Sequence, residues 1–168
     1  GEALLRKSDL LLLLGKEEES RTLLEKIFAE YPGSPYEKRA ARKMGERHKE
    51  AGRFTEAISF LEKAKTGNDY EPNAQFQFEI GECYEALGDG KNALEAFSHV
   101  AFLYPKSTYW VMRAYLKMGS LFEREKRWKE AVQTYEKLAG WHRLEEAKIA
   151  KERLEWIHHN ILASQKAP

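Results

Sequence analysis

Residues 80–105 read IGECYEALGDGKNALEAFSHVAFLYP, and this stretch decides the fold. Helix-forming Ala, Glu, Leu and Lys fill its two halves, while Gly88-Asp89-Gly90 separates the halves and Pro105 ends the second one. An Asp-Gly pair marks a β-hairpin between alternating β-branched or aromatic residues, but these flanks favour helix. The stretch therefore predicts two helices joined by a tight turn.

A glycine recurs along the chain, followed by an alanine twelve residues later and a larger side chain four residues after that. The three sets are Gly45, Ala57 and Leu61; Gly81, Ala93 and Phe97; and Gly119, Ala131 and Tyr135. Glycine inside a helix costs roughly 1 kcal/mol relative to alanine, so it is expected where two helices approach closely. Fixed spacing within units that are joined by variable connectors predicts a repeat of helix pairs, each stacking on the next.

Prolines and turn glycines place the helix ends, and no alternating β-branched run predicts a strand. Ser34, Pro35 and Glu37 have the capping-box pattern of a helix start. Ala147, Ala150, Leu154, Ile157 and Ile161 make an apolar stripe on a final helix. The predicted helices span about residues 2–14, 17–31, 35–51, 54–65, 73–87, 90–103, 108–125, 128–139 and 143–163.

This joint pattern resembles the tetratricopeptide repeat. The third unit carries the most of the family's positions, namely Ile80, Gly81, Tyr84, Gly88, Ala93, Phe97 and Pro105. The family's early Trp is missing from all units, and the first unit is degenerate. The resemblance implies an all-α, right-handed α-solenoid forming a single array over residues 1–168. Its repeats would span about 1–34, 35–72, 73–108 and 109–142, with a capping helix at about 143–163.

The resemblance also implies a binding surface, because the first helix of each pair lines a concave groove in this family. The matching positions are Arg39, Arg42, Glu46 and Lys49; Gln75, Phe78, Glu82 and Glu85; and Arg113, Leu116, Ser120, Glu123 and Arg124. They predict a basic wall, an acidic middle with one aromatic, and a mixed far wall. Such a surface suits a partner's peptide or helix with patterned charge and an apolar anchor.

Alternatives remain for each of these residues. A charged side chain on a helix is often simply solvated. Phe78 is either an exposed hot spot or, with the register shifted by one residue, part of the core. Glu46 and Glu82 stand where some family members clamp a C-terminal carboxylate, which glutamate would repel, so this mode of binding is not expected.

Two connectors, YPGSPY at 31–36 and YPKSTY at 104–109, resemble junctions of bacterial cell-envelope members of the family. The Tol–Pal coordinator and the outer-membrane assembly lipoprotein are examples. The resemblance implies a periplasmic or envelope scaffold. A local explanation also stands, in which Tyr packs on a helix end, Pro ends the helix and Ser caps the next one, so a cytoplasmic location is the alternative.

Net charge and the length of apolar runs exclude some classes of function. With 28 Lys+Arg against 27 Asp+Glu in 168 residues, the net charge of +1 gives no global reason to bind nucleic acid. The longest apolar run, Leu10 to Leu14, is too short to cross a bilayer and predicts exposed leucines at this end. We expect these leucines either to pack against a preceding repeat or to support self-association of this end.

No catalytic, cofactor or metal motif is recognisable. Cys83 has no partner base and is expected to be a buried, unreactive thiol, and His158-His159 are adjacent on a helix and point apart. The sequence therefore predicts a noncatalytic scaffold, without cofactor or metal, that binds another protein. A structural spacer within a longer array is the alternative.

Overall fold

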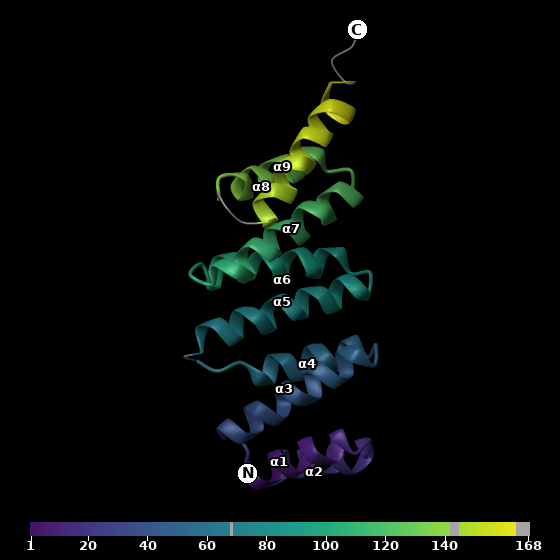
Figure 1. Cartoon of the computed structure of the whole chain (residues 1–168), viewed down its shortest axis with the longest axis vertical. Helices are drawn as coiled ribbons and strands as arrows, with labels where there is room; N and C mark the ends of the chain where they lie inside the picture. Colours follow the sequence, from purple (N-terminus) through teal and green to yellow (C-terminus); the bar gives the residue numbers. More distant parts are fainter. Residues whose placement is uncertain (68, 142–144, 164–168) are drawn as a thin grey trace. The chain divides into compact units, whose positions relative to one another are not determined.

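The computed structural model describes residues 1–67, 69–141 and 145–163, and over these ranges it is entirely helical. The helices in chain order are α1 (Glu2–Leu13), α2 (Glu17–Glu30), α3 (Pro35–Glu50), α4 (Phe54–Ala64), α5 (Tyr70–Ala86), α6 (Gly90–Leu103), α7 (Thr108–Arg124), α8 (Trp128–Ala139), α9 (Glu145–Ile157) and a π-helical turn η1 (His158–Leu162) (Figure 1). The predicted all-α class is confirmed.

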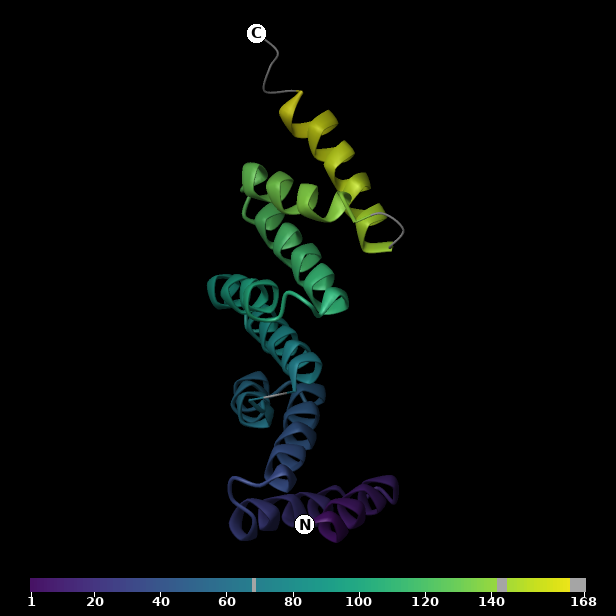
Figure 2. The same ribbon diagram turned by 90° about the vertical axis from the view of Figure 1, so that its left-hand side faces the viewer.

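The chain forms two compact units, Gly1–Gly88 with α1 to α5 and Asp89–Pro168 with α6 to α9. The division falls inside the predicted third repeat, 73–108. In unit 1, α1 packs on α2, α3 on α4, and α4 on α5 (Figure 2). One part of its core consists of the buried side chains of Leu5, Leu24, Ile27, Ala40 and Met44.

In unit 2, α7 packs on both α6 and α8, and α9 packs on α8 and α7. Its core contains Met112, Ala131, Tyr135, Leu138, Ala150 and Ile157. The predicted apolar stripe of the final helix is confirmed, because Ala147, Ala150 and Ile157 are buried while Leu154 and Ile161 pack against this core. The helix itself is shorter than predicted and ends in η1, and predicted positions 142–144 lie outside the described residues.

The recurring glycines occupy matching places in the two units. A Cβ added at Gly45 would lie 3.0 Å from Leu61 Cγ, and one added at Gly119 would lie 2.4 Å from Tyr135 Cε1. Both partners are the large side chains that follow the repeat alanine by four residues. The predicted close approach is therefore confirmed at these two positions, and Gly81 is also buried.

Two helix starts show how local chemistry sets the boundaries. Ser34 Oγ accepts a hydrogen bond from the Glu37 amide at 3.2 Å, and the Glu37 carboxylate accepts one from the Gly33 amide at 2.5 Å. Helix α5 begins at Tyr70, three residues before the predicted start. Pro72 is tolerated there because the first amides of a helix have no intrahelical acceptor to lose.

Candidate functional site

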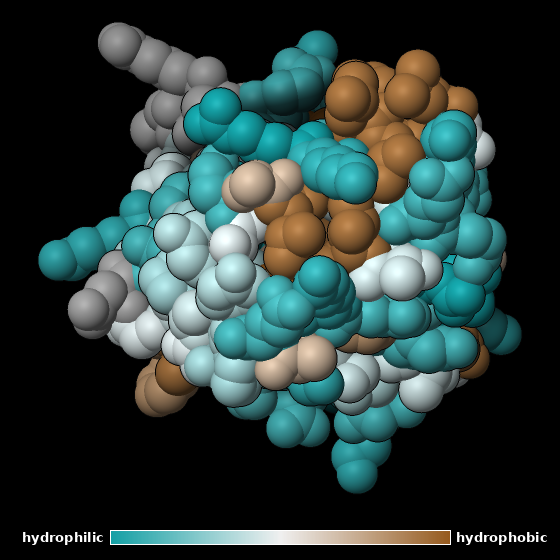
Figure 3. All heavy atoms as spheres, turned by 90° about the horizontal axis from the view of Figure 1, so that it is seen from below, coloured by the Kyte–Doolittle hydropathy of each residue, from teal (hydrophilic) through white to brown (hydrophobic). Residues whose placement is uncertain are grey.

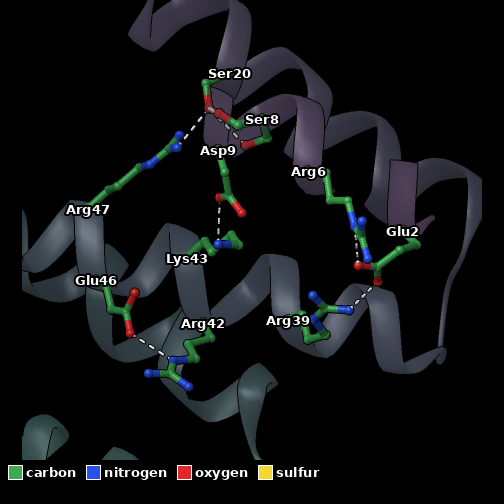
Figure 4. A network of polar contacts seen from close by, with 10 residues as sticks. All are labelled: Glu2, Arg6, Ser8, Asp9, Ser20, Arg39, Arg42, Lys43, Glu46 and Arg47. Carbon is green, nitrogen blue, oxygen red and sulfur yellow. Dashed lines mark hydrogen bonds and ion pairs between the residues drawn. The ribbon is translucent and has the colours of Figure 1, made fainter. Parts of the chain in front are cut away.

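The first helices of the pairs in unit 1, α1, α3 and α5, are joined by ion pairs between their polar faces. Arg39 Nη1 of α3 lies 2.5 Å from Glu2 Oε2 of α1, and Lys43 Nζ lies 2.6 Å from Asp9 Oδ1 (Figure 4). Lys49 Nζ of α3 lies 2.7 Å from Glu82 Oε2 of α5. These three helices therefore present one continuous charged surface, which we call the α1–α3–α5 face.

The Lys49–Glu82 pair is the most shielded of these contacts, with side-chain exposures of 30% and 25%. Burial alone would lower the pKa of Lys49, but the hydrogen bond and charge of Glu82 outweigh it and raise that pKa. The Glu2–Arg39 pair is about half exposed. Exposed pairs of this kind contribute at most about 1 kcal/mol to stability, so they set side-chain positions more than they hold the fold.

The structure brings most of the predicted unit 1 residues together on this face. Arg39 and Arg42 are exposed, and Arg42 Nε donates to Glu46 Oε1 at 2.8 Å. Gln75 is half-buried and donates to Glu79 Oε1 at 2.8 Å. Glu85 is also half-buried.

Of the two alternatives predicted for Phe78, the core position is the one that the structure shows, because the side chain is only 1% exposed, and the exposed hot spot is wrong. Helix α5 buries residues around most of its circumference, including Phe76, Gln77, Phe78 and Ile80 in sequence order. A helix buried in this way has no single apolar stripe, so sequence periodicity does not show that both Phe76 and Phe78 are buried.

A pocket of about 240 Å³ opens between α3, the end of α4 and the start of α5. Lys38, Arg39 and Arg42 contribute cations to its lining, and Phe76 contributes an aromatic ring. The Arg42 guanidinium carbon lies 5.9 Å from the centre of the Phe76 ring. Sequence reasoning missed Lys38 and Phe76, although the basic run 38–43 and the two alternating phenylalanines of α5 were visible signals.

The loop at the pocket is fastened to α5. Asn73 Oδ1 accepts a hydrogen bond from the Thr66 amide at 3.0 Å, and Asn73 Nδ2 donates to the Thr66 carbonyl. Thr66 Oγ1 accepts from the Asp69 amide at 3.2 Å. These bonds satisfy the Thr66 amide, the Thr66 carbonyl and the Asp69 amide beside the pocket.

Predicted residues in unit 2 have different roles. Glu123 was predicted as a groove residue, but it points into the unit and its side chain is only 13% exposed. Its carboxylate accepts a hydrogen bond from the Tyr135 hydroxyl at 2.7 Å and binds the Arg153 guanidinium of α9. Leu116 packs against the core. Glu123 is covered because α9 packs on α7 and places Arg153 against its carboxylate.

Other unit 2 residues do lie near the surface. Arg124 and Ser120 are exposed. Arg113 is half-buried, with its guanidinium carbon 5.4 Å from the Tyr109 ring centre and 5.6 Å from that of Trp110.

A second surface of unit 1 is apolar. Leu10, Leu13 and Leu14 of the α1 end are 57%, 85% and 64% exposed, whereas Leu11 between them is buried. Figure 3, which looks onto this end, shows an apolar patch bordered by polar residues. The predicted exposure of leucines is confirmed.

The described residues offer no recognisable reaction chemistry. Cys83 is fully buried, as predicted, and burial raises its pKa to about 11, so the thiol stays protonated. Over the described ranges, no group of three His, Cys, Asp or Glu side chains is placed to hold a metal ion. None of the described helices is both long and apolar enough to span a bilayer.

Family models match nearly the whole chain in two pieces. The model described as soluble NSF attachment protein, SNAP, matches residues 36–154, and a tetratricopeptide repeat model matches residues 2–34. No curated protein sequence matches the chain. The match to a tetratricopeptide repeat model confirms the predicted family.

Solved structures share the fold. A tetratricopeptide repeat protein from Parabacteroides merdae superposes with a TM-score of 0.75 at 19% identity, over 95% of this chain and 60% of its own. MamA superposes with a TM-score of 0.65 at 21% identity, over 90% of this chain and 78% of its own. The P58(IPK) TPR domain reaches 0.55 at 21% identity, over 99% of this chain and 48% of its own. The chain thus spans less than two thirds of two of these structures.

Proposed function

The chain belongs to the soluble NSF attachment protein (SNAP) family, and from that premise we propose that it is a noncatalytic scaffold holding a segment of a partner protein on the α1–α3–α5 face. The family is named for NSF attachment, which supports a binding role. Helical repeats of this kind present rigid surfaces on which extended or helical segments dock.

The observation that carries the proposal is the arrangement of cations on this face. Arg39 and Arg42 are exposed, although Arg39 is paired with Glu2 and Arg42 with Glu46. Held cations lose little side-chain entropy when a partner binds, and this pre-organisation favours association. Their position beside an aromatic-lined pocket supplies an apolar anchor point within the same face.

Charge reversal tests the proposal. We expect the double variant Arg39→Glu, Arg42→Glu to lose capture of partner proteins that the unaltered chain retains from its source lysate, and to keep its helical circular dichroism. The double variant Lys26→Glu, Arg21→Glu, on exposed α2 positions, is the matched control. Equal capture by all three chains would contradict the proposal and favour the alternative function, a structural spacer without its own ligand.

The exposed leucines support a second candidate function, self-association. We propose that the patch of Leu10, Leu13 and Leu14 is covered by a second copy of this chain. Lys7 and Glu17 are exposed three residues before Leu10 and three residues after Leu14 in the sequence, so opposite charges are available near the patch in a two-fold arrangement. Leu13→Glu is expected to abolish a concentration-dependent dimer in analytical ultracentrifugation, and a monomer in the unaltered chain at high micromolar concentration would contradict this.

A periplasmic or envelope location stays part of the proposal, supported by the two connector motifs. The first connector also has the predicted local role, since the Tyr31 and Tyr36 rings pack edge to face at 5.7 Å and Ser34 caps α3. At the second, Ser107 is the N-cap of α7 without a side-chain cap bond. A topology reporter fused to the chain in its natural context separates the periplasm from the cytoplasm.

A further inference from the structure

We propose that the pocket between α3 and α5 is an anchor subsite that takes an acidic side chain of the partner together with a neighbouring apolar side chain. This rests on the proposed scaffold function and specifies the chemistry of the bound segment. The pocket belongs entirely to unit 1, and its lining comes from α3, the end of α4, the following loop and α5.

The lining of the pocket holds several charged side chains. Lys38, Arg39 and Arg42 line the pocket against one carboxylate, Asp69. Within the part of the chain that the structure describes, the Lys38 ammonium makes no ion pair, and only Nε of the Arg42 guanidinium is bound by Glu46. The lining itself therefore carries more cations than carboxylates, with Glu2 and Glu46 pairing Arg39 and Arg42 from outside it. The part of the Arg42 guanidinium that Glu46 leaves unbound is suited to a carboxylate.

The rest of the pocket lining is largely apolar. Phe76 forms part of the wall and its ring lies under the Arg42 guanidinium, while Pro35, Pro72 and Ala64 complete the apolar surface. Stacking on a ring fixes the guanidinium plane and leaves its edge for hydrogen bonding. An acidic group that binds this edge would place an adjacent apolar side chain against the phenylalanine.

Size selects the kind of ligand. Sites for whole small molecules usually enclose roughly 300–1,000 Å³, whereas this pocket encloses about 240 Å³. It has room for one or two side chains of a longer segment. The rest of such a segment would lie along the α1–α3–α5 face, where Lys43 and Lys49 continue the row of cations on α3.

Nuclear magnetic resonance titration with a capped dipeptide tests the subsite without the natural partner. The probe is N-acetyl-Leu-Glu-amide, and we expect amide shifts in Arg42, Thr66 and Phe76 with a dissociation constant of about 1 mM, typical of a small fragment. Arg42→Gln should raise this constant about tenfold through loss of a charged hydrogen bond. Lys26→Gln, on exposed α2, should leave it unchanged.

Two further probes decide the chemistry. N-acetyl-Leu-Gln-amide should bind at least about tenfold more weakly, because the amide is neutral. Equal binding of the two dipeptides, or shifts only with N-acetyl-leucine and its free terminal carboxylate, would overturn the proposal. Absence of any shift at these amides while Arg39 and Arg42 still govern partner capture would overturn the subsite alone. Dipeptide binding without partner capture would overturn the scaffold function instead.

Discussion

Both units place a glycine where two helices approach closely, but a different side chain packs against the glycine in each unit. Gly45 in unit 1 lies against Leu61, and Gly119 in unit 2 lies against Tyr135. Leucine contributes only contacts, whereas the Tyr135 hydroxyl donates a hydrogen bond to Glu123, which also binds Arg153. The Glu123 carboxylate of α7 is thus used inside unit 2, whereas Arg39 and Arg42 of α3 stay exposed on unit 1.

Adding one methyl group at each glycine should give the largest difference in stability loss between the two units. In Gly119→Ala, the new Cβ meets a ring 98% buried and held by Glu123, so we expect a loss of about 2–3 kcal/mol through overpacking. In Gly45→Ala, the new Cβ lies 3.0 Å from Leu61 Cγ and 3.3 Å from the Leu61 backbone nitrogen, a milder overlap than at Gly119. The higher helix propensity of alanine offsets about 1 kcal/mol of its cost. Hydrogen exchange of α7–α8 measures the stability loss in unit 2, and that of α3–α4 measures the loss in unit 1. Equal losses from the two substitutions would contradict the expected difference.

Removing the Glu123 charge should produce the next largest effect. Glu123→Gln weakens charged hydrogen bonds to Arg153 and Tyr135, and we expect unit 2 to lose about 1–2 kcal/mol at pH 7. Glu46→Gln, in the exposed pair with Arg42, should change the stability of unit 1 by less than about 0.5 kcal/mol. A similar cost for both would show that Glu123 is an ordinary surface charge.

The Glu123 interaction also predicts a pH dependence. Burial raises the pKa of Glu123, but hydrogen bonds from Arg153 and Tyr135 outweigh it and hold that pKa below its ordinary value. The stabilisation is therefore complete above the unfolded carboxyl pKa of about 4.3 and is lost as pH falls through the lower folded value. In thermal unfolding from pH 6 to pH 3, Glu123→Gln should converge with the parent chain at the acid end.

The pH dependence of stability expected from Glu79 in unit 1 has the opposite sign to that expected from Glu123. Burial raises the pKa of Glu79 although Gln75 donates to it, and within the described chain its buried Oε2 has no hydrogen-bond partner. Below about pH 4.3 the Glu79 carboxyl is mostly protonated in both the folded and the unfolded chain. As pH rises, the carboxyl ionises more readily in the unfolded chain, and the folded state loses stability relative to it. Glu79→Gln should therefore stabilise unit 1 by about 0.5–1 kcal/mol at pH 8 and by nothing at pH 4 in urea unfolding. Destabilisation at pH 8 would contradict this.

The sequence predicts the fold well because its signals are local. Helix ends follow from prolines and turn glycines, and the glycine–alanine spacing predicted contacts that exist at Gly45 and Gly119. The site was predicted less well, because binding depends on which neighbour covers each helix face. Periodicity does not reveal that α9 covers Glu123, that α5 is buried around Phe78, or that Phe76 lines a pocket with Arg42.

The smallest expected effect concerns the turn between the helices of a pair. Unit 1 uses Gly52 with φ of 71°, whereas unit 2 places Lys126 in the same left-handed region with φ of 57°. A side chain there costs about 1–2 kcal/mol, part of which glycine returns through its larger unfolded-state entropy. Lys126→Gly should thus stabilise unit 2 by about 0.5 kcal/mol, and Gly52→Lys should destabilise unit 1 by a similar amount. Hydrogen exchange at the two turns measures both changes in stability. If neither substitution changes stability, the flanking helices, and not the turn residue, dictate this conformation.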